Sequence, residues 1–271
     1  MKILRVRPVA PSKDPSRHRY REILTIVVQC FSKIEGIGMV PLGFQYLAGV
    51  SIIVTWVLVI AAVWPRQRRM ILLSAGLAAP HALSALLLVP HYWRPPSVLF
   101  FGIAFEDVLF MIGVGGMAWV FSVWPVRGEI EVVFRWRSIV RRYGVLMVGT
   151  AIAGLALSRI PGPARMTAII AVMFAISVTA VAFRSELWPM AVAGCLCSGT
   201  SYAVAMLAGA LAWPEFMELW HHENLWGPRI GGVPFEEIVW AALFGPSWSL
   251  VMALVVDARV RGTRSRCEVP E

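Results

Sequence analysis

Charged residues are scarce in this chain of 271 residues, because Asp, Glu, Lys and Arg together make up only 15% of it. Hydrophobic residues make up 58%, and the mean hydropathy is +0.69. A soluble domain carries about a quarter charged residues, so the composition excludes an ordinary water-soluble protein. It predicts an all-α, polytopic membrane helix bundle.

Lysine is almost absent, since it occurs only at Lys2, Lys13 and Lys33. A seven-helix retinal protein needs a lysine in its last helix for the Schiff base, so that class is excluded. The four cysteines include no C-x-x-C pair and lack metal-ligand spacing, so we expect neither a disulfide nor a metal site. No G-x-G-x-x-G loop stands between a strand and a helix, and we expect no flavin, nicotinamide or other cofactor.

Apolar runs that could cross a bilayer occur seven times. A helix needs roughly 20 mostly apolar residues to cross about 30 Å of hydrocarbon. The candidate spans are residues 43–64, 70–89, 97–124, 145–157, 166–183, 188–213 and 230–258. We expect the segment 23–40 to lie in the interface as an amphipathic helix, with an eighth crossing as the alternative.

Arginines gather in the connectors at one end of these spans. They follow the first, third and seventh spans: Arg66, Arg68, Arg69, Arg127, Arg135, Arg137, Arg141, Arg142, Arg259, Arg261, Arg264 and Arg266. The positive-inside rule assigns this end to the cytoplasm. We therefore interpret the net charge of +9 as a topology signal and expect no nucleic-acid partner. The prediction is a multi-pass protein of the plasma membrane with a cytoplasmic C-terminus.

A nine-residue motif occurs twice, 130 residues apart. Residues 102–110 read GIAFEDVLF and residues 232–240 read GVPFEEIVW, and Gly115 recurs as Gly245 at the same offset. An aromatic loop with histidine and proline precedes each copy, HYWRPPS before the first and WHHENLWGP before the second. Repeats of this kind are common in membrane proteins and often place a binding site between the halves.

The offset predicts a domain organisation of three spans, one connector and three spans. Equivalent helices are four positions apart in the order of the spans, so the two repeats are parallel, and the acidic motifs should face each other at similar depth. The predicted segments are a basic leader with the amphipathic helix (1–42), the first repeat (43–124), the connector with the fourth span (125–165), the second repeat (166–258) and a basic tail (259–271).

Each motif carries two adjacent acids, Glu106 and Asp107 in the first and Glu236 and Glu237 in the second. The first pair lies about ten residues, or roughly 15 Å, into the span 97–124 and so near the midplane; the second lies nearer the start of its span. A carboxylate there costs a few kcal/mol. Protonated acids could fasten the bundle by hydrogen bonds. Alternatively they form a site that donates and accepts protons, because burial and a neighbouring carboxylate let an acid and a base coexist.

Aromatic residues stand close to these acids in the sequence. Their ring faces can stabilise a cation in a dry site, and together with the acids they suggest protonation of an alkene. The candidates for substrate binding are Trp93, Phe105, Phe110, Trp226, Phe235 and Trp240.

These motifs resemble the lycopene cyclase domain family of small membrane cyclases, in which an aromatic loop and a Gly precede a Pro-x-Glu-Glu motif. GVPFEEIVW has Pro234, Glu236 and Glu237 in the motif positions, whereas Ala104 and Asp107 replace the proline and the second Glu in GIAFEDVLF. The resemblance implies an isomerase that protonates a terminal alkene, closes a ring through a carbocation and removes a proton, without redox change. It assigns the catalytic roles to the four motif acids.

The resemblance also implies the partners. The substrate would be a lipophilic isoprenoid such as lycopene, taken from the bilayer and its lipids, and other enzymes of carotenoid or terpenoid biosynthesis would be the protein partners. Three alternatives stay open: a cyclase of prenylated meroterpenoids, a proton-coupled carrier, since parallel repeats with buried acids also suit that class, and a non-catalytic subunit of a larger cyclase.

Overall fold

The computed structural model describes residues 41–95, 103–126, 130–132 and 134–260. The basic leader, the predicted interfacial helix over 23–40 and the tail after residue 260 lie outside these ranges.

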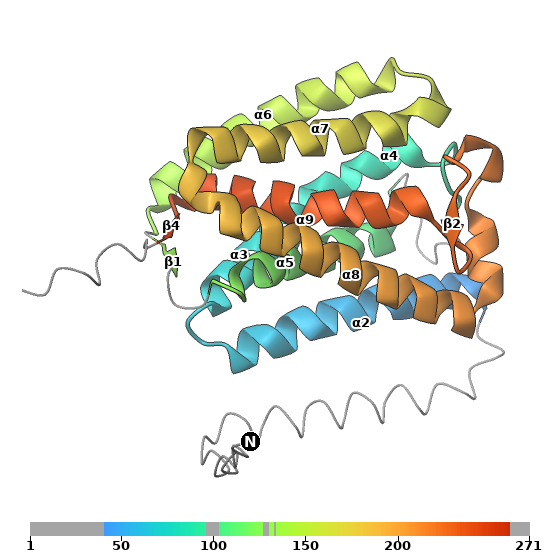
Figure 1. Ribbon diagram of the computed structural model, residues 1–271, viewed down its shortest axis with the longest axis horizontal. Helices are drawn as coiled ribbons and strands as arrows, with labels where there is room; N and C mark the ends of the chain where they lie inside the picture. The colour runs from blue at the N-terminus through green and yellow to red at the C-terminus, as the bar shows by residue number, and fades with distance from the viewer. Residues whose placement is uncertain (1–40, 96–102, 127–129, 133, 261–271) are drawn as a thin grey trace, which may run out of the picture. The chain divides into compact units, whose positions relative to one another are not determined.

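Seven helical spans long and apolar enough to cross a membrane make up most of the described chain (Figure 1). They are α2 (Leu42–Val63); α3 (Arg68–Ala78) continued by η2 (Ala79–Ser84) and α4 (Ala85–Leu88); α5 (Phe105–Val123); α6 (Trp136–Ser158); α7 (Gly162–Phe183); η3 (Ser185–Leu187) with α8 (Trp188–Ala212); and α9 (Phe235–Val256). Long apolar runs fold this way because a helix satisfies its own backbone groups where water is absent. The prediction of a multi-pass, all-α membrane protein is confirmed.

Short elements connect the spans. The loop before α9 contains η4 (Pro214–Leu219), η5 (His222–Asn224) and a small hairpin of β2 (Arg229–Ile230) and β3 (Val233–Pro234). At the opposite end of the spans, β1 (Ile130–Glu131) pairs antiparallel with β4 (Arg259–Val260).

Helices α5 and α9 form the centre of the bundle. α5 packs against α2, α3 and α8, α9 packs against α7 and α8, and α5 and α9 pack against each other. By contrast, α6 lies beside α7 along one edge of the bundle (Figure 1), and Ile139 is the only one of its residues that is buried. The central pair is therefore the part of the fold most shielded from lipid.

Glycines allow both central helices to approach their neighbours closely. A Cβ atom at Gly115 of α5 would overlap Ala78 of α3, and one at Gly245 of α9 would overlap Ser198 of α8 and lie 2.5 Å from the carbonyl oxygen of Gly194. Small residues at such crossings strengthen helix association in membranes by bringing the backbones together. The glycine that the sequence repeats thus has the same packing role in each half.

The starts of four helices differ from the sequence prediction by four residues or more: α7 begins four residues before the predicted 166, α9 begins five residues after the predicted 230, and α5 and α6 also differ. α5 begins at Phe105, because Ala104 is extended (φ −70°, ψ 143°), so the prediction of one helix over 97–124 is wrong, and the acids lie in the first turn of α5 and not ten residues into a helix. Asp107 Oδ2 instead accepts a hydrogen bond from the Ala104 amide (3.3 Å) and caps the helix. Acidic residues are favoured in a first turn because the helix dipole is positive there. α6 begins at Trp136, nine residues before the predicted 145.

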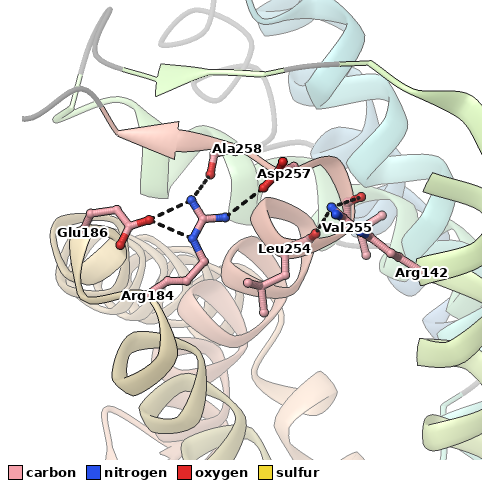
Figure 2. A network of polar contacts seen from close by, with 7 residues as sticks. All are labelled: Arg142, Arg184, Glu186, Leu254, Val255, Asp257 and Ala258. Carbon is pink, nitrogen blue, oxygen red and sulfur yellow. Dashed lines mark hydrogen bonds and ion pairs between the residues drawn. The ribbon is translucent and has the colours of Figure 1, made fainter. Parts of the chain in front are cut away.

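The C-terminal end of α9 is held by two arginines from other elements (Figure 2). Arg142 of α6 donates to the carbonyl oxygen of Leu254 (2.9 Å), and Arg184 donates to that of Ala258 (2.7 Å). Arg184 also pairs with Asp257, whose backbone is left-handed (φ 54°). Guanidinium groups satisfy carbonyls that a helix end leaves unpaired and match the negative end of its dipole.

Candidate active site

Both acid pairs lie in the first turn of a central helix, at the same end of the bundle. Three spans separate α5 from α9, so the two helices run in the same direction. One turn after the acids, Phe110 stacks on Trp240 with ring centroids 5.7 Å apart. These two residues end the two copies of the motif, so equivalent positions of the copies meet in space.

All four acids are buried, the first member of each pair more deeply than the second. Glu106 and Glu236 are each 1% exposed, whereas Asp107 is 7% and Glu237 is 8% exposed. A buried carboxyl group is costly unless hydrogen bonds replace the lost water. The hydrogen-bond partners of each acid therefore indicate whether its surroundings favour the carboxylate or the protonated acid.

The second acid of each pair accepts a hydrogen bond from a tyrosine. The Tyr46 hydroxyl donates to Asp107 Oδ1 (2.8 Å), and the Tyr202 hydroxyl donates to Glu237 Oε2 (2.8 Å). Trp220 Nε1 donates to the other Glu237 oxygen (3.0 Å). Both oxygens of Glu237 thus face donors, an environment that stabilises a carboxylate.

Glu236 has a different environment. Its Oε1 accepts a hydrogen bond from the Trp226 amide (3.0 Å), while its Oε2 is buried without a hydrogen-bond partner in the described part of the chain. Trp226 is itself fixed by its indole nitrogen, which donates to Thr167 Oγ1 (2.7 Å). One oxygen of Glu236 is therefore held in place and the other is left for a further partner.

The loops before α5 and α9 join above the acids through their aromatic residues. Trp93 and Trp220 form an isolated antiparallel bridge, and their rings stack with centroids 5.5 Å apart. Tyr46 and Trp93 make an edge-to-face contact, with ring centroids 5.2 Å apart. Tyr46, Trp93 and Trp220 thus link Asp107 of one motif to Glu237 of the other.

Tyr92, beside this bridge, is a buried phenol near the second acid pair. Burial, and then the nearby carboxyl groups of Glu237 and Glu236, raise the pKa of Tyr92 far above its ordinary range. Its side chain consequently stays a neutral phenol at any physiological pH.

Aromatic rings continue along α9 away from the acids. Trp240 stacks on Phe244 with centroids 5.1 Å apart, and Phe244 on Trp248 at 6.4 Å. The rings of Tyr202 and Trp240 contact each other with centroids 6.0 Å apart. Tyr202, whose hydroxyl donates to Glu237, therefore belongs to the same aromatic cluster.

The structure brings most of the predicted substrate-binding residues together. Trp93, Phe110 and Trp240 lie among the rings described above, and Trp226 and Phe235 lie at the edge of the site with centroids 6.4 Å apart. Phe105 does not join them: it is 48% exposed and contacts no aromatic ring within the described ranges.

Four aromatic residues of the site were not among the predicted site residues: Tyr46, Tyr92, Tyr202 and Trp220. The signal for the three tyrosines is rarity, because the chain has only five tyrosines; Trp220, one of twelve tryptophans, has no such signal. A tyrosine hydroxyl in an apolar helix needs a hydrogen-bond partner, so Tyr46 and Tyr202 could have been matched to the acids. Within the described residues no group of three or more His, Cys, Asp or Glu side chains could hold a metal ion.

Residues 164–255 match the family model of lycopene cyclase. The match confirms the resemblance over most of α7, all of α8, the loop before α9 and most of α9, a range that includes Glu236 and Glu237 and the two donors to Glu237, Tyr202 and Trp220. It does not extend to the first motif around Glu106. No curated protein and no solved structure matches the chain. The lycopene cyclase match therefore rests on the second half of the bundle.

Proposed function

We propose that this protein is a membrane-embedded cyclase that isomerises an isoprenoid of the carotenoid type, such as lycopene. A carboxylic acid protonates a terminal alkene, the carbocation closes a ring by forming a carbon–carbon bond, and a carboxylate removes a proton. One proton enters and one leaves, so the product is an isomer and no redox cofactor is required. The lycopene cyclase match over the second acid pair supports this class of reaction.

The observation that carries the proposal is the unequal environment of two adjacent buried acids. Glu237 receives two strong donors and suits the carboxylate, which is the proton acceptor. Glu236 has one donor and a buried oxygen without a partner, which suits a neutral acid that presents its proton to a substrate. Pairs of acids whose surroundings separate their protonation states are typical of acid–base sites.

The aromatic cluster supplies the second requirement, stabilisation of a cation away from water. Trp240 and Phe110 stack one turn after the acids, and the rings of Phe244 and Trp248 continue the cluster. Faces of tryptophan and phenylalanine attract positive charge, more strongly where the site is desolvated. An isoprenoid chain that enters from the bilayer would meet apolar rings along its length and acids at its end.

The first acid pair has the same order of burial, with Tyr46 donating to the second acid. We infer a second acid–base pair at Glu106 and Asp107. We also infer that the arginine-rich end faces the cytoplasm, that the C-terminus lies on that side, and that the membrane is the plasma membrane.

The proposal is tested by pigment analysis in a lycopene-accumulating host. The wild-type chain should convert lycopene into a cyclic product, and Glu236→Gln and Glu237→Gln should each reduce that product at least a hundredfold while protein stays in the membrane fraction. Glu215→Gln is the matched control, because Glu215 is exposed and has no ion pair or hydrogen bond within the described residues. Unchanged lycopene with the membrane-inserted wild type would contradict the carotenoid assignment, and full conversion by Glu236→Gln would contradict the site.

A further inference from the structure

A hollow of about 590 Å³ opens at the start of α6, at the end of the bundle opposite the acids. Arg135, Arg137 and Arg141 line it together with Trp136 and Ser138. The three arginines are exposed, and none has an ion pair or hydrogen bond within the part of the chain that the structure describes. Among the described residues no carboxylate lines the hollow, so this part of the chain presents a concave surface with three positive charges.

Neighbouring arginines in the first turns of α6 point in different directions. Arg142 points inward and donates to the Leu254 carbonyl at the end of α9 (Figure 2), whereas Arg141 faces the hollow. Successive residues of a helix point about 100° apart. Arg142 therefore stabilises the end of α9, whereas the side chain of Arg141 is left to bind a ligand in the hollow. Within the described ranges, the three lining arginines therefore have no structural partner that would explain them.

The surroundings of the hollow favour a lipid over a soluble anion. Trp136 is 63% exposed beside the arginines, as is common for tryptophan at a membrane interface. The helix continues with exposed apolar side chains at Val140, Val145 and Val148, and Ile139 is its only buried residue. A ligand that combines a phosphate group with acyl chains would meet both kinds of surface.

We propose that this hollow binds the headgroup of an anionic phospholipid, with the acyl chains lying along α6. Arginine suits this ligand because its guanidinium group can donate two parallel hydrogen bonds to one phosphate. Basic side chains at a membrane surface are attracted to anionic lipids in the same way. The site is separate from the cyclase proposal, since it lies at the other end of the spans and uses none of its residues.

The test measures lipid retention by the full chain in detergent, by native mass spectrometry with added phosphatidylglycerol or phosphatidylcholine. The variant carries Arg135→Gln, Arg137→Gln and Arg141→Gln. The matched control removes the same charge from three exposed arginines at the same end that do not line the hollow: Arg66→Gln, Arg68→Gln and Arg69→Gln. Thermal unfolding of both variants verifies that each is folded.

The expected result is that wild type and control retain phosphatidylglycerol in preference to phosphatidylcholine, and that the hollow variant retains at least about tenfold less of it. Equal loss in both variants would overturn the proposal, since general surface charge would then account for binding. Retention unchanged in the hollow variant would also overturn it. Inorganic phosphate should not displace the lipid at equal concentration; displacement would assign the hollow to free phosphate.

Discussion

Phe110 of α5 stacks on Trp240 of α9 with ring centroids 5.7 Å apart, although 130 residues separate them in the chain. The two residues hold the same position in the two copies of the motif. Contact between equivalent positions is what a two-fold relationship between parallel units produces at its axis. One acid pair precedes each ring by a single turn, so this contact lies one turn further along the central helices than the two proposed acid–base pairs.

The first prediction concerns this contact. Phe110→Ala and Trp240→Ala should each destabilise the bundle, and the double variant should lose less than the sum of the two, with a coupling of about 0.5–1.5 kcal/mol. Unfolding in detergent measures the cycle. The control cycle pairs Phe110→Ala with Phe174→Ala, an exposed residue of α7, and should show no coupling. Additive effects at Phe110 and Trp240 would contradict a direct contact.

The second prediction concerns the donors to Glu237. Tyr202→Phe removes one hydrogen bond to a charged group and keeps the ring, and Trp220→Phe removes the other hydrogen bond while replacing the indole with a smaller aromatic ring; each should slow product formation about tenfold to a hundredfold. Tyr143→Phe is the control, because the Tyr143 hydroxyl donates to the Leu77 carbonyl (2.7 Å), outside the site. Conversion rates normalised to protein in the membrane give the readout. Wild-type rates in both Tyr202→Phe and Trp220→Phe would refute Glu237 as the proton acceptor.

The third prediction concerns the close crossing of α8 and α9. Gly245→Ala forces a methyl group against Ser198 and the Gly194 backbone and should cost about 1–3 kcal/mol of stability. Gly149→Ala on α6 is the matched control, because a Cβ there meets no atom within 4 Å. It should be neutral or slightly stabilising, since alanine favours a helix over glycine. Melting temperatures in detergent compare the two, and equal shifts would contradict the packing.

The fourth prediction concerns the C-terminal end of α9. Arg142→Gln removes a charged donor to the Leu254 carbonyl and should lower stability by about 1–2 kcal/mol. Arg141→Gln removes the same charge from the neighbouring exposed side chain and should leave stability within about 0.5 kcal/mol in detergent without anionic lipid. If the two variants unfolded at the same temperature, the contact in Figure 2 would have no role in stability.

Hydropathy was sufficient to predict the number and approximate limits of the spans, because an apolar run of this length has one stable form in lipid. The position of the acids was not predictable from it. The run over 97–124 is apolar throughout its first part, and only the extended conformation of Ala104 places Glu106 in a first turn. The capping role of Asp107 did have a local signal in the sequence. Asp107 is the third residue of α5, and an acidic side chain at this position often accepts a hydrogen bond from the backbone amide that precedes the helix.

The partners of the acids depend on tertiary structure and could not be read from the motif. Tyr46 comes from α2 and Tyr202 from α8, which are not equivalent in the predicted repeat, although each donates to the second acid of a pair. Loop residues such as Trp220 add a third source. The repeat itself, its boundaries and the connector stay predictions, supported by the shared start of α5 and α9 at Phe105 and Phe235.

Helix α6, with Ile139 as its single buried residue, has a consequence for how such a chain could arise. A unit of three crossings begins on one side of the bilayer and ends on the other. Joining two such units end to end would invert the second, and its acids would then open toward the wrong leaflet. One additional crossing restores the orientation. A fusion of two genes whose products face the same way in the membrane would therefore need a helix of this kind, selected for its length and hydrophobicity more than for the shape of its packing surface.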